Sequence, residues 1–196
     1  MSDQGSGSWQ TPPPPAPGGF QAAPPAAGPA PGVVYADTIT RVIAYIIDAI
    51  IFFVVLVFIV GLIIVGIFTS GGGAAIIGTI ILAVLGLAGS AVYFIYTWTR
   101  MRASIGQRVL GLETVNAADG ATLTQEQAIR RWAFLFGPTA LGSVLGYAPG
   151  LGGIGSLVGL LAFIYQIYLL YTVSQSPKRQ GYHDVQAGTV VVKRVG

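Results

Sequence analysis

The chain has no cysteine, a single histidine and very few charged residues, and each shortage excludes a class of protein. Without cysteine there is no disulfide, no thiolate metal ligand and no cysteine nucleophile. Only 9% of the 196 residues are charged, whereas 53% are hydrophobic. Soluble domains carry about a quarter charged residues. So few charges do not keep such an apolar chain in water, and the composition predicts a protein that lies in a lipid bilayer.

Motifs that carry enzyme chemistry are also missing. The sequence has no Gly-x-x-x-x-Gly-Lys phosphate loop, no Gly-x-Ser-x-Gly elbow and no cluster with metal-ligand spacing. His183 lies beside Asp184, but no nucleophile pattern is near, so we interpret this histidine as a surface or helix-end residue. Asp48 and Asp184 imitate the pair of an intramembrane aspartyl protease, yet Asp184 lies outside the apolar stretches. We therefore expect no enzyme, no catalytic residue, no cofactor, no metal and no nucleic-acid partner.

Proline is concentrated near the N-terminus. Nine of the 12 prolines lie between Pro12 and Pro31, mixed with alanine and glycine. Such a segment lacks backbone donors and bulky apolar side chains, so it forms no packed core. We expect residues 1–34 to be a disordered cytoplasmic tail and residues 35–196 to form a membrane domain. The run 12–15 favours polyproline II, which serves either as a plain tether or as a docking segment for a protein partner.

Four long apolar stretches follow this tail. The first contains 20 uncharged residues from Ala49 to Phe68, about the number that crosses a hydrocarbon core. Polar turns at 69–73 and 146–153 join the stretches into two hairpins. The predicted fold class is an all-α membrane protein, a bundle of four transmembrane helices. Their expected ranges are about 38–68, 74–99, 128–146 and 153–173.

The segment between the second and third helices has a different character from the apolar stretches. Residues 104–110 are suited to a short interfacial helix, and residues 109–115 to a β-strand. A second strand is expected at 188–193, and we predict that the two pair as a small two-stranded cytoplasmic sheet. Thr124 and Gln127 form a capping-box pattern that predicts the start of the third long helix.

Positive charge is distributed unevenly along the chain. The two hairpin turns contain no lysine or arginine, whereas the 100–131 segment and the C-terminal tail contain nine of the ten. Because cytoplasmic loops carry the excess of lysine and arginine, this distribution predicts that both termini face the cytoplasm.

Asp48 is the one acid inside an apolar helix, and Arg41 precedes it by about two helical turns on the same face. In an antiparallel hairpin, Asp48 lies level with Tyr93 and Tyr96, with Arg100 one turn further out. These are its expected partners, because an unpaired buried carboxylate is expensive. Two roles remain open for Asp48. It is either an ion- or proton-binding group in a transport path, or an acid pinned by a neighbour to hold the bundle in register.

Small residues recur with helical spacing in the last two apolar stretches. Gly142-xxx-Gly146 and Gly155-xxx-Gly159 are small-xxx-small pairs. They fit either close packing of these two helices on each other or a contact between copies of the chain.

Three blocks of the sequence resemble the RDD family of bacterial membrane proteins, which is named for one arginine and two aspartates. The blocks are 41–48 (RVIAYIID), 104–112 (SIGQRVLGL) and 178–191 (KRQGYHDVQAGTVV). The resemblance implies that Arg41, Asp48 and Asp184 act together as a functional or ion-pair cluster on the cytoplasmic side. The family often has lysine at the position of Gln107. The residues that we expect to support the cluster are Tyr93, Tyr96, Arg100 and Arg108.

The resemblance also implies a place in the bacterial plasma membrane and the transport of an unknown ligand, with sodium/proton exchange proposed for some members. The first hypothesis is therefore a transporter or transporter subunit, in which the three residues form a polar site open to the cytoplasm. Since four helices make a thin wall around a path, we expect such a transporter to be a homo-oligomer. The alternative is a non-catalytic scaffold, in which the three residues lock the sheet onto the bundle and the tail recruits a partner.

Overall fold

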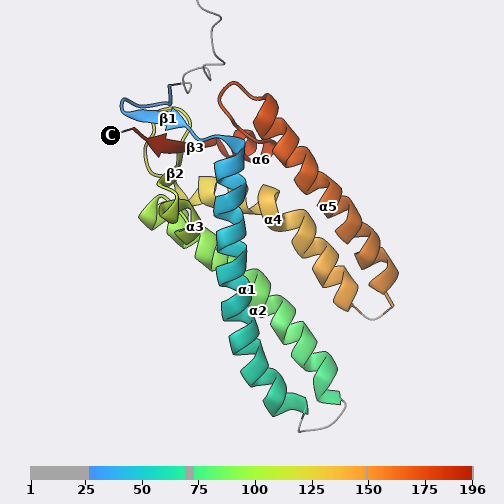
Figure 1. Ribbon diagram of the computed structural model, residues 1–196. Helices are drawn as coiled ribbons and strands as arrows, with labels where there is room; N and C mark the ends of the chain where they lie inside the picture. Colours follow the sequence, from blue (N-terminus) through green and yellow to red (C-terminus); the bar gives the residue numbers. More distant parts are fainter. Residues whose placement is uncertain (1–26, 69–72, 149, 196) are drawn as a thin grey trace, which may run out of the picture.

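The computed structural model describes residues 27–68, 73–148 and 150–195 (Figure 1). Most of the expected N-terminal tail, and all of the expected turn at 69–73 except Gly73, lie outside the described residues. The described part consists mainly of helices, with a small sheet at one end.

Four long helices dominate the fold and form two antiparallel hairpins. They are α1 (Thr38–Phe68), α2 (Gly73–Tyr96), α4 (Gln125–Tyr147) and α5 (Gly152–Gln175). The hairpins lie side by side near the sheet and diverge toward their turns (Figure 1). The expected helix ranges agree with these to within about three residues. α2 ends earlier than expected because the chain passes into a π-helical turn at Thr97–Met101.

Local side-chain chemistry explains where two of the helices begin. Asp37 accepts hydrogen bonds from the backbone N–H of Thr40, at 2.8 Å, and from its hydroxyl, which satisfies a free donor at the start of α1. Thr124 and Gln127 exchange side-chain bonds with each other's backbone at the start of α4. The predicted capping box is therefore confirmed.

Two short helices belong to the sheet end of the molecule. The expected short helix is present as α3 (Ile105–Val109), and it also begins with a capping box, between Ser104 and Gln107. The second, α6 (Tyr182–Ala187), ends at Gly188, whose φ of +64° lets the chain turn sharply into the last strand.

The sheet has three strands in the order β1-β3-β2, all antiparallel. β2 (Leu112–Asn116) pairs with β3 (Thr189–Arg194), as predicted. The expected number of two strands is wrong, because β1 (Val33–Tyr35) covers the other edge of β3. β1 begins inside the range assigned to the tail. Its valine, valine and tyrosine are typical strand residues that follow the proline-rich segment directly.

Helices α4 and α5 approach each other closely at glycines. A Cβ atom on Gly142 would lie 2.9 Å from the backbone nitrogen of Gly159, and one on Gly155 would collide with the backbone of Gly146. The small-xxx-small pairs therefore serve the contact between α4 and α5, which confirms the first of the two interpretations.

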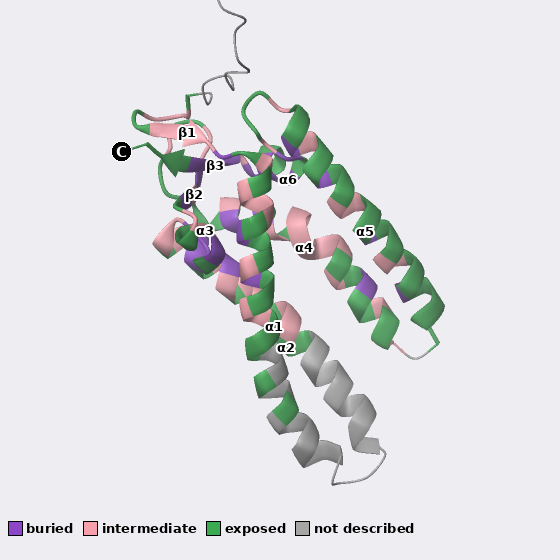
Figure 2. Ribbon diagram, in the orientation of Figure 1, coloured by how far each residue is buried: buried purple, intermediate pink, exposed green. Residues whose placement is uncertain are grey.

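Buried residues are concentrated near the sheet, whereas most residues of α5 are exposed (Figure 2). Along α5 the exposed fraction of Phe163 is 63% and that of Leu160 is 57%. Thr38–Val55 of α1 and Gly152–Gln175 of α5 are long and apolar enough to cross a membrane. Exposed apolar surface of this extent is typical of a site that contacts a membrane or another protein.

Candidate functional site

The centre of the site is a buried carboxylate held between two arginines. Asp184, on α6, is 0% exposed. Its Oδ2 atom lies 3.1 Å from Nη1 of Arg41, and its Oδ1 atom pairs with Nη1 of Arg131. The backbone N–H of Gly181 and the hydroxyl of Thr189 complete the set of donors. Two guanidinium groups therefore share one carboxylate, which leaves an excess of one positive charge around Asp184.

Arg41 joins the first helix to the sheet. Its Nε donates to the carbonyl oxygen of Ala36 at 3.2 Å, and its Nη2 donates to that of Val191 at 2.9 Å. Ala36 lies between β1 and α1, and Val191 lies in β3. One side chain therefore ties α1, the sheet and α6 together.

Arg131 comes from the first turns of α4 and lies over an aromatic ring. Its Cζ atom is 5.0 Å from the centre of the Trp98 ring, a favourable cation–π distance. Its Nη1 also donates to Thr189 Oγ1 at 2.7 Å. With 4% of its surface exposed, Arg131 is a buried cation that depends on these partners.

Asp48 is held separately, by neutral donors. Its Oδ1 accepts from the Tyr93 hydroxyl at 2.8 Å and from the backbone N–H of Gly106 at 2.7 Å, and its Oδ2 accepts from the Ser104 hydroxyl at 2.5 Å. A Cβ atom on Gly106 would lie 3.0 Å from Asp48 Cγ and would collide with the carbonyl of Ala44. Only glycine lets the start of α3 approach α1 this closely.

The three residues of the family motif thus form two groups rather than one cluster. Arg41 and Asp184 meet, while Asp48 binds the start of α3. The reason is that the backbone N–H and hydroxyl groups at this helix start satisfy Asp48 without a cation.

The residues expected to support the motif divide in the same way. Tyr93 contacts Asp48, but Tyr96, Arg100 and Arg108 are exposed. The nearby Arg102 pairs with Glu113 at 2.9 Å.

Sequence reasoning counted Arg131 only as a loop charge and missed its place in the site. Ala128, Arg131 and Leu135 follow each other at spacings of three and four residues, which puts them on one face of α4. Ala128 and Arg131 are buried, whereas Arg130 is exposed and pairs with Glu126. The helical period of this apolar face was the signal that would have found Arg131.

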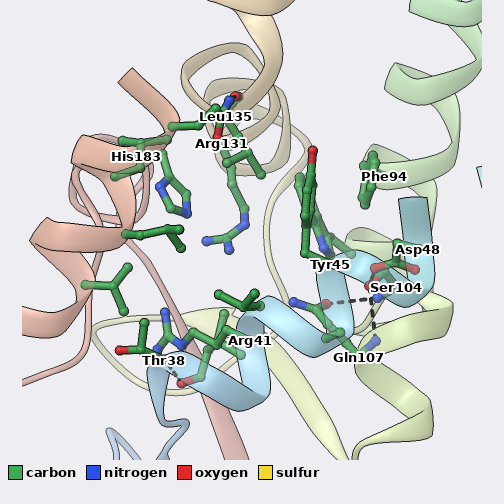
Figure 3. Close-up of a pocket in the computed structure, with 18 of the residues that line it drawn as sticks. Thr38, Arg41, Tyr45, Asp48, Phe94, Ser104, Gln107, Arg131, Leu135 and His183 are labelled. Atoms are coloured by element: carbon green, nitrogen blue, oxygen red, sulfur yellow. Dashed lines mark hydrogen bonds between the residues drawn. The ribbon is translucent and has the colours of Figure 1, made fainter. Parts of the chain in front are cut away.

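A cavity of about 350 Å³ lies between the long helices at the sheet end (Figure 3). Its walls are mainly apolar. The polar side chains that line it include Arg41, Asp48, Arg131, His183, Gln107 and Gln166. Cavities with apolar walls and a few convergent polar groups are typical ligand sites.

Four of the lining residues carry a buried polar atom without a hydrogen-bond partner among the described residues. These atoms are Thr38 Oγ1, Trp98 Nε1, Arg131 Nε and His183 Nδ1. Buried polar atoms are rarely left unpaired, because each costs about 1–3 kcal/mol. All four residues line this one cavity.

His183 is buried beside Asp184, so the expectation of a surface residue is wrong, although the residue does lie at the start of a helix. Burial, together with the charges of Arg131 and Arg41, lowers the pKa of His183 well below its usual value of 6.5. The imidazole is therefore neutral at pH 7.

The fold and the site define a membrane-associated helical protein in which an arginine and two aspartates organise one end of the bundle. The model of the RDD family matches residues 35–188, and the chain belongs to this family. The resemblance seen in the sequence is thereby confirmed. No curated protein and no solved structure matches the chain.

Proposed function

We propose that this protein spans a bacterial plasma membrane four times, with both termini in the cytoplasm, and transports a small ligand. Two helices that are long and apolar enough to cross a membrane support the insertion, and α2 and α4 complete the two hairpins with them. The unequal distribution of lysine and arginine supports the orientation, because the cations lie at the sheet end and the hairpin turns have none.

The observation that carries the transport proposal is the cavity, with its four unpartnered polar atoms. It lies where α1, α2, α4 and α5 come together, at the end of the bundle that we assign to the cytoplasm. A ligand that enters the cavity from this end of the bundle would meet Arg131 and His183 first. The proposal includes no covalent step, so we do not treat the protein as an enzyme.

A second candidate is a non-catalytic scaffold, and the bonding of the two aspartates favours it. Asp184 accepts from α1, α4, β3 and the backbone before α6, and Asp48 accepts from three donors on α2 and around α3. Carboxylates with so many partners hold the sheet and α3 onto the bundle. In that role the proline-rich tail would recruit a protein partner.

Flux measurements separate the two candidates. Purified protein is placed in liposomes that contain a pH-sensitive dye, and the currents and dye signals are recorded after pulses of sodium, potassium or phenyl phosphate. A transporter gives a saturable signal that protein-free liposomes lack. Silence for all three probes from protein that is folded and inserted contradicts transport and favours the scaffold.

Asp48→Asn is the informative variant in this assay. As a transport residue, Asp48 is needed for the signal even when the variant remains folded. As a purely structural residue, it affects the signal only in proportion to the loss of folded protein. Asp119→Asn is the matched control. Asp119 is exposed, and its side chain accepts a hydrogen bond from the N–H of Ala121, which asparagine can accept as well.

A further inference from the structure

The carboxylate oxygens at the cavity are already in use. Both oxygens of Asp184 accept two bonds each, from four different groups. Asp48 accepts three bonds from its own set of donors. A cationic ligand would therefore find no free carboxylate oxygen and would have to displace donors from one of these acids.

Two of the four unpartnered atoms can only donate a hydrogen bond. Trp98 Nε1 and Arg131 Nε carry hydrogens and have no lone pair to offer, and both are buried without a partner. Arg131 uses only Nη1 for Asp184 and Thr189. Its Nη2 has no acceptor among the described residues. The side of the guanidinium formed by Nε and Nη2 is thus an unoccupied fork, the geometry that binds two oxygens of a carboxylate or phosphate.

The net charge around Asp184 is positive, which favours a negatively charged ligand for the free donors. Around Asp184, Arg41 and Arg131 carry two positive charges against one negative charge, and His183 is neutral. The second carboxylate of the cavity, Asp48, is held apart from this group by neutral donors of α2 and of the start of α3. The guanidinium of Arg131 points into the cavity between His183 and Arg41 (Figure 3). An added negative charge would balance this excess beside Arg131, of whose surface only 4% is exposed, so that the charge interaction is stronger than in water.

The rest of the cavity accepts an apolar group. Phe94, Leu135, Phe163 and Leu169 form walls on the side of the long helices. A fully hydrated inorganic ion would leave this apolar surface unused. A ligand that matches both the donors and the apolar walls of the cavity is an organic molecule with an anionic head and an apolar body.

We propose that the cavity binds an organic oxyanion, a carboxylate or phosphate monoester with an apolar body, whose oxygens meet Arg131 and Trp98. This assignment rests on the proposed ligand-binding role of the cavity and adds the class of ligand. The same chemistry is offered by a free solute and by the headgroup of an anionic lipid, and the experiment below distinguishes these two sources.

The test measures binding to the full chain in nanodiscs of zwitterionic lipid, by isothermal titration calorimetry. Hexanoate and phenyl phosphate present the anionic head, whereas hexanol and hexyltrimethylammonium keep an apolar body without it. We expect saturable binding of the two anions, at least tenfold tighter than binding of the other two probes.

Trp98→Phe keeps an aromatic ring but removes the Nε1 donor, so we expect it to weaken hexanoate binding about tenfold. Trp132→Phe is the matched control. Trp132 Nε1 is also buried without a partner, but the residue does not line the cavity, so its replacement should leave the affinity unchanged. Should Trp98→Phe fail to fold, the comparison of the four probes on the unmodified chain decides.

The outcomes separate the failure of this inference from the failure of the proposed function. Preferential binding of hexanol or hexyltrimethylammonium overturns the oxyanion assignment but leaves the cavity as a ligand site. An equal loss of hexanoate affinity in the two tryptophan variants has the same consequence. No binding of any probe overturns both. Repeating the titration in nanodiscs with phosphatidylglycerol identifies the source. Competition assigns the site to a lipid headgroup, and unchanged affinity assigns it to a free anion.

Discussion

Nη1 of Arg41 lies 3.1 Å from Oδ2 of Asp184, although 143 positions separate the two residues in the sequence. The pair joins the first turn of α1 to the short helix before β3. Because Arg131 binds the other oxygen of the same carboxylate, three distant segments of the chain depend on one acidic side chain.

Asp184→Asn should lower the free energy of unfolding by about 3–5 kcal/mol, because it leaves two buried arginines without their shared negative charge. Chemical unfolding in detergent micelles, followed by circular dichroism, measures the change. Arg130→Gln is the control, since the Arg130–Glu126 pair is largely exposed and should contribute less than about 1 kcal/mol. Equal effects of the two substitutions would show that Asp184 is not a structural centre.

Asp48→Asn should lower the free energy of unfolding by about 1–3 kcal/mol and loosen α3 specifically. An asparagine has one acceptor oxygen where the aspartate has two, so at least one donor among Tyr93, Ser104 and Gly106 is left unpaired. Hydrogen exchange measured by mass spectrometry should become faster in α3. Unchanged protection of α3, with the variant folded, would contradict the anchoring role of Asp48.

Gly155→Ala should separate α4 from α5, because a Cβ atom at this position would collide with the backbone of Gly146. We expect a loss of stability of about 1–3 kcal/mol. Gly153→Ala lies in the same turn of α5, where a Cβ atom meets nothing within 4 Å. This control should be neutral or slightly stabilising, since alanine favours the helix over glycine. The melting temperatures of the two variants are compared. An equal decrease in both temperatures would show that the contact between Gly155 and Gly146 is not the cause.

Acidification should destabilise the protein between pH 6.5 and pH 5 through His183. The pKa of His183 is lowered in the folded state, so the unfolded state binds the proton more readily in this range. His183 therefore lowers the free energy of unfolding as the pH decreases below 6.5, by at most about 1.4 kcal/mol per pH unit, and its contribution levels off at higher pH.

Because His183 is the only histidine, His183→Gln should abolish the slope in this range. The pKa of Asp37 is lowered by its hydrogen bonds to Thr40, from an ordinary value of 3.8, so its contribution is lost only at lower pH. Unfolding curves at pH 5, 6 and 7 measure the slope, and a slope that persists in the variant would assign it to another group.

The long helices could be predicted because their signals are local. Twenty uncharged residues in a row, glycine-rich polar turns and the Thr124 capping box each act within a few residues of chain, and the observed bounds follow them closely. The pairing of β2 with β3 could also be predicted, since two isolated strands have few other strands to pair with. β1 was missed because its three residues directly follow a segment whose composition indicates disorder.

The apolar character of the chain, the helical hairpins and the family could be inferred from the sequence, as could the marked residues Arg41, Asp48 and Asp184. How these residues are used became clear from the folded structure alone. It brought Arg131, a distant residue of α4, to Asp184, and it gave Asp48 to the start of α3. The physical reason is that a buried carboxylate binds whichever donors the folded backbone places around it, and residues remote in sequence carry no local signal of that placement.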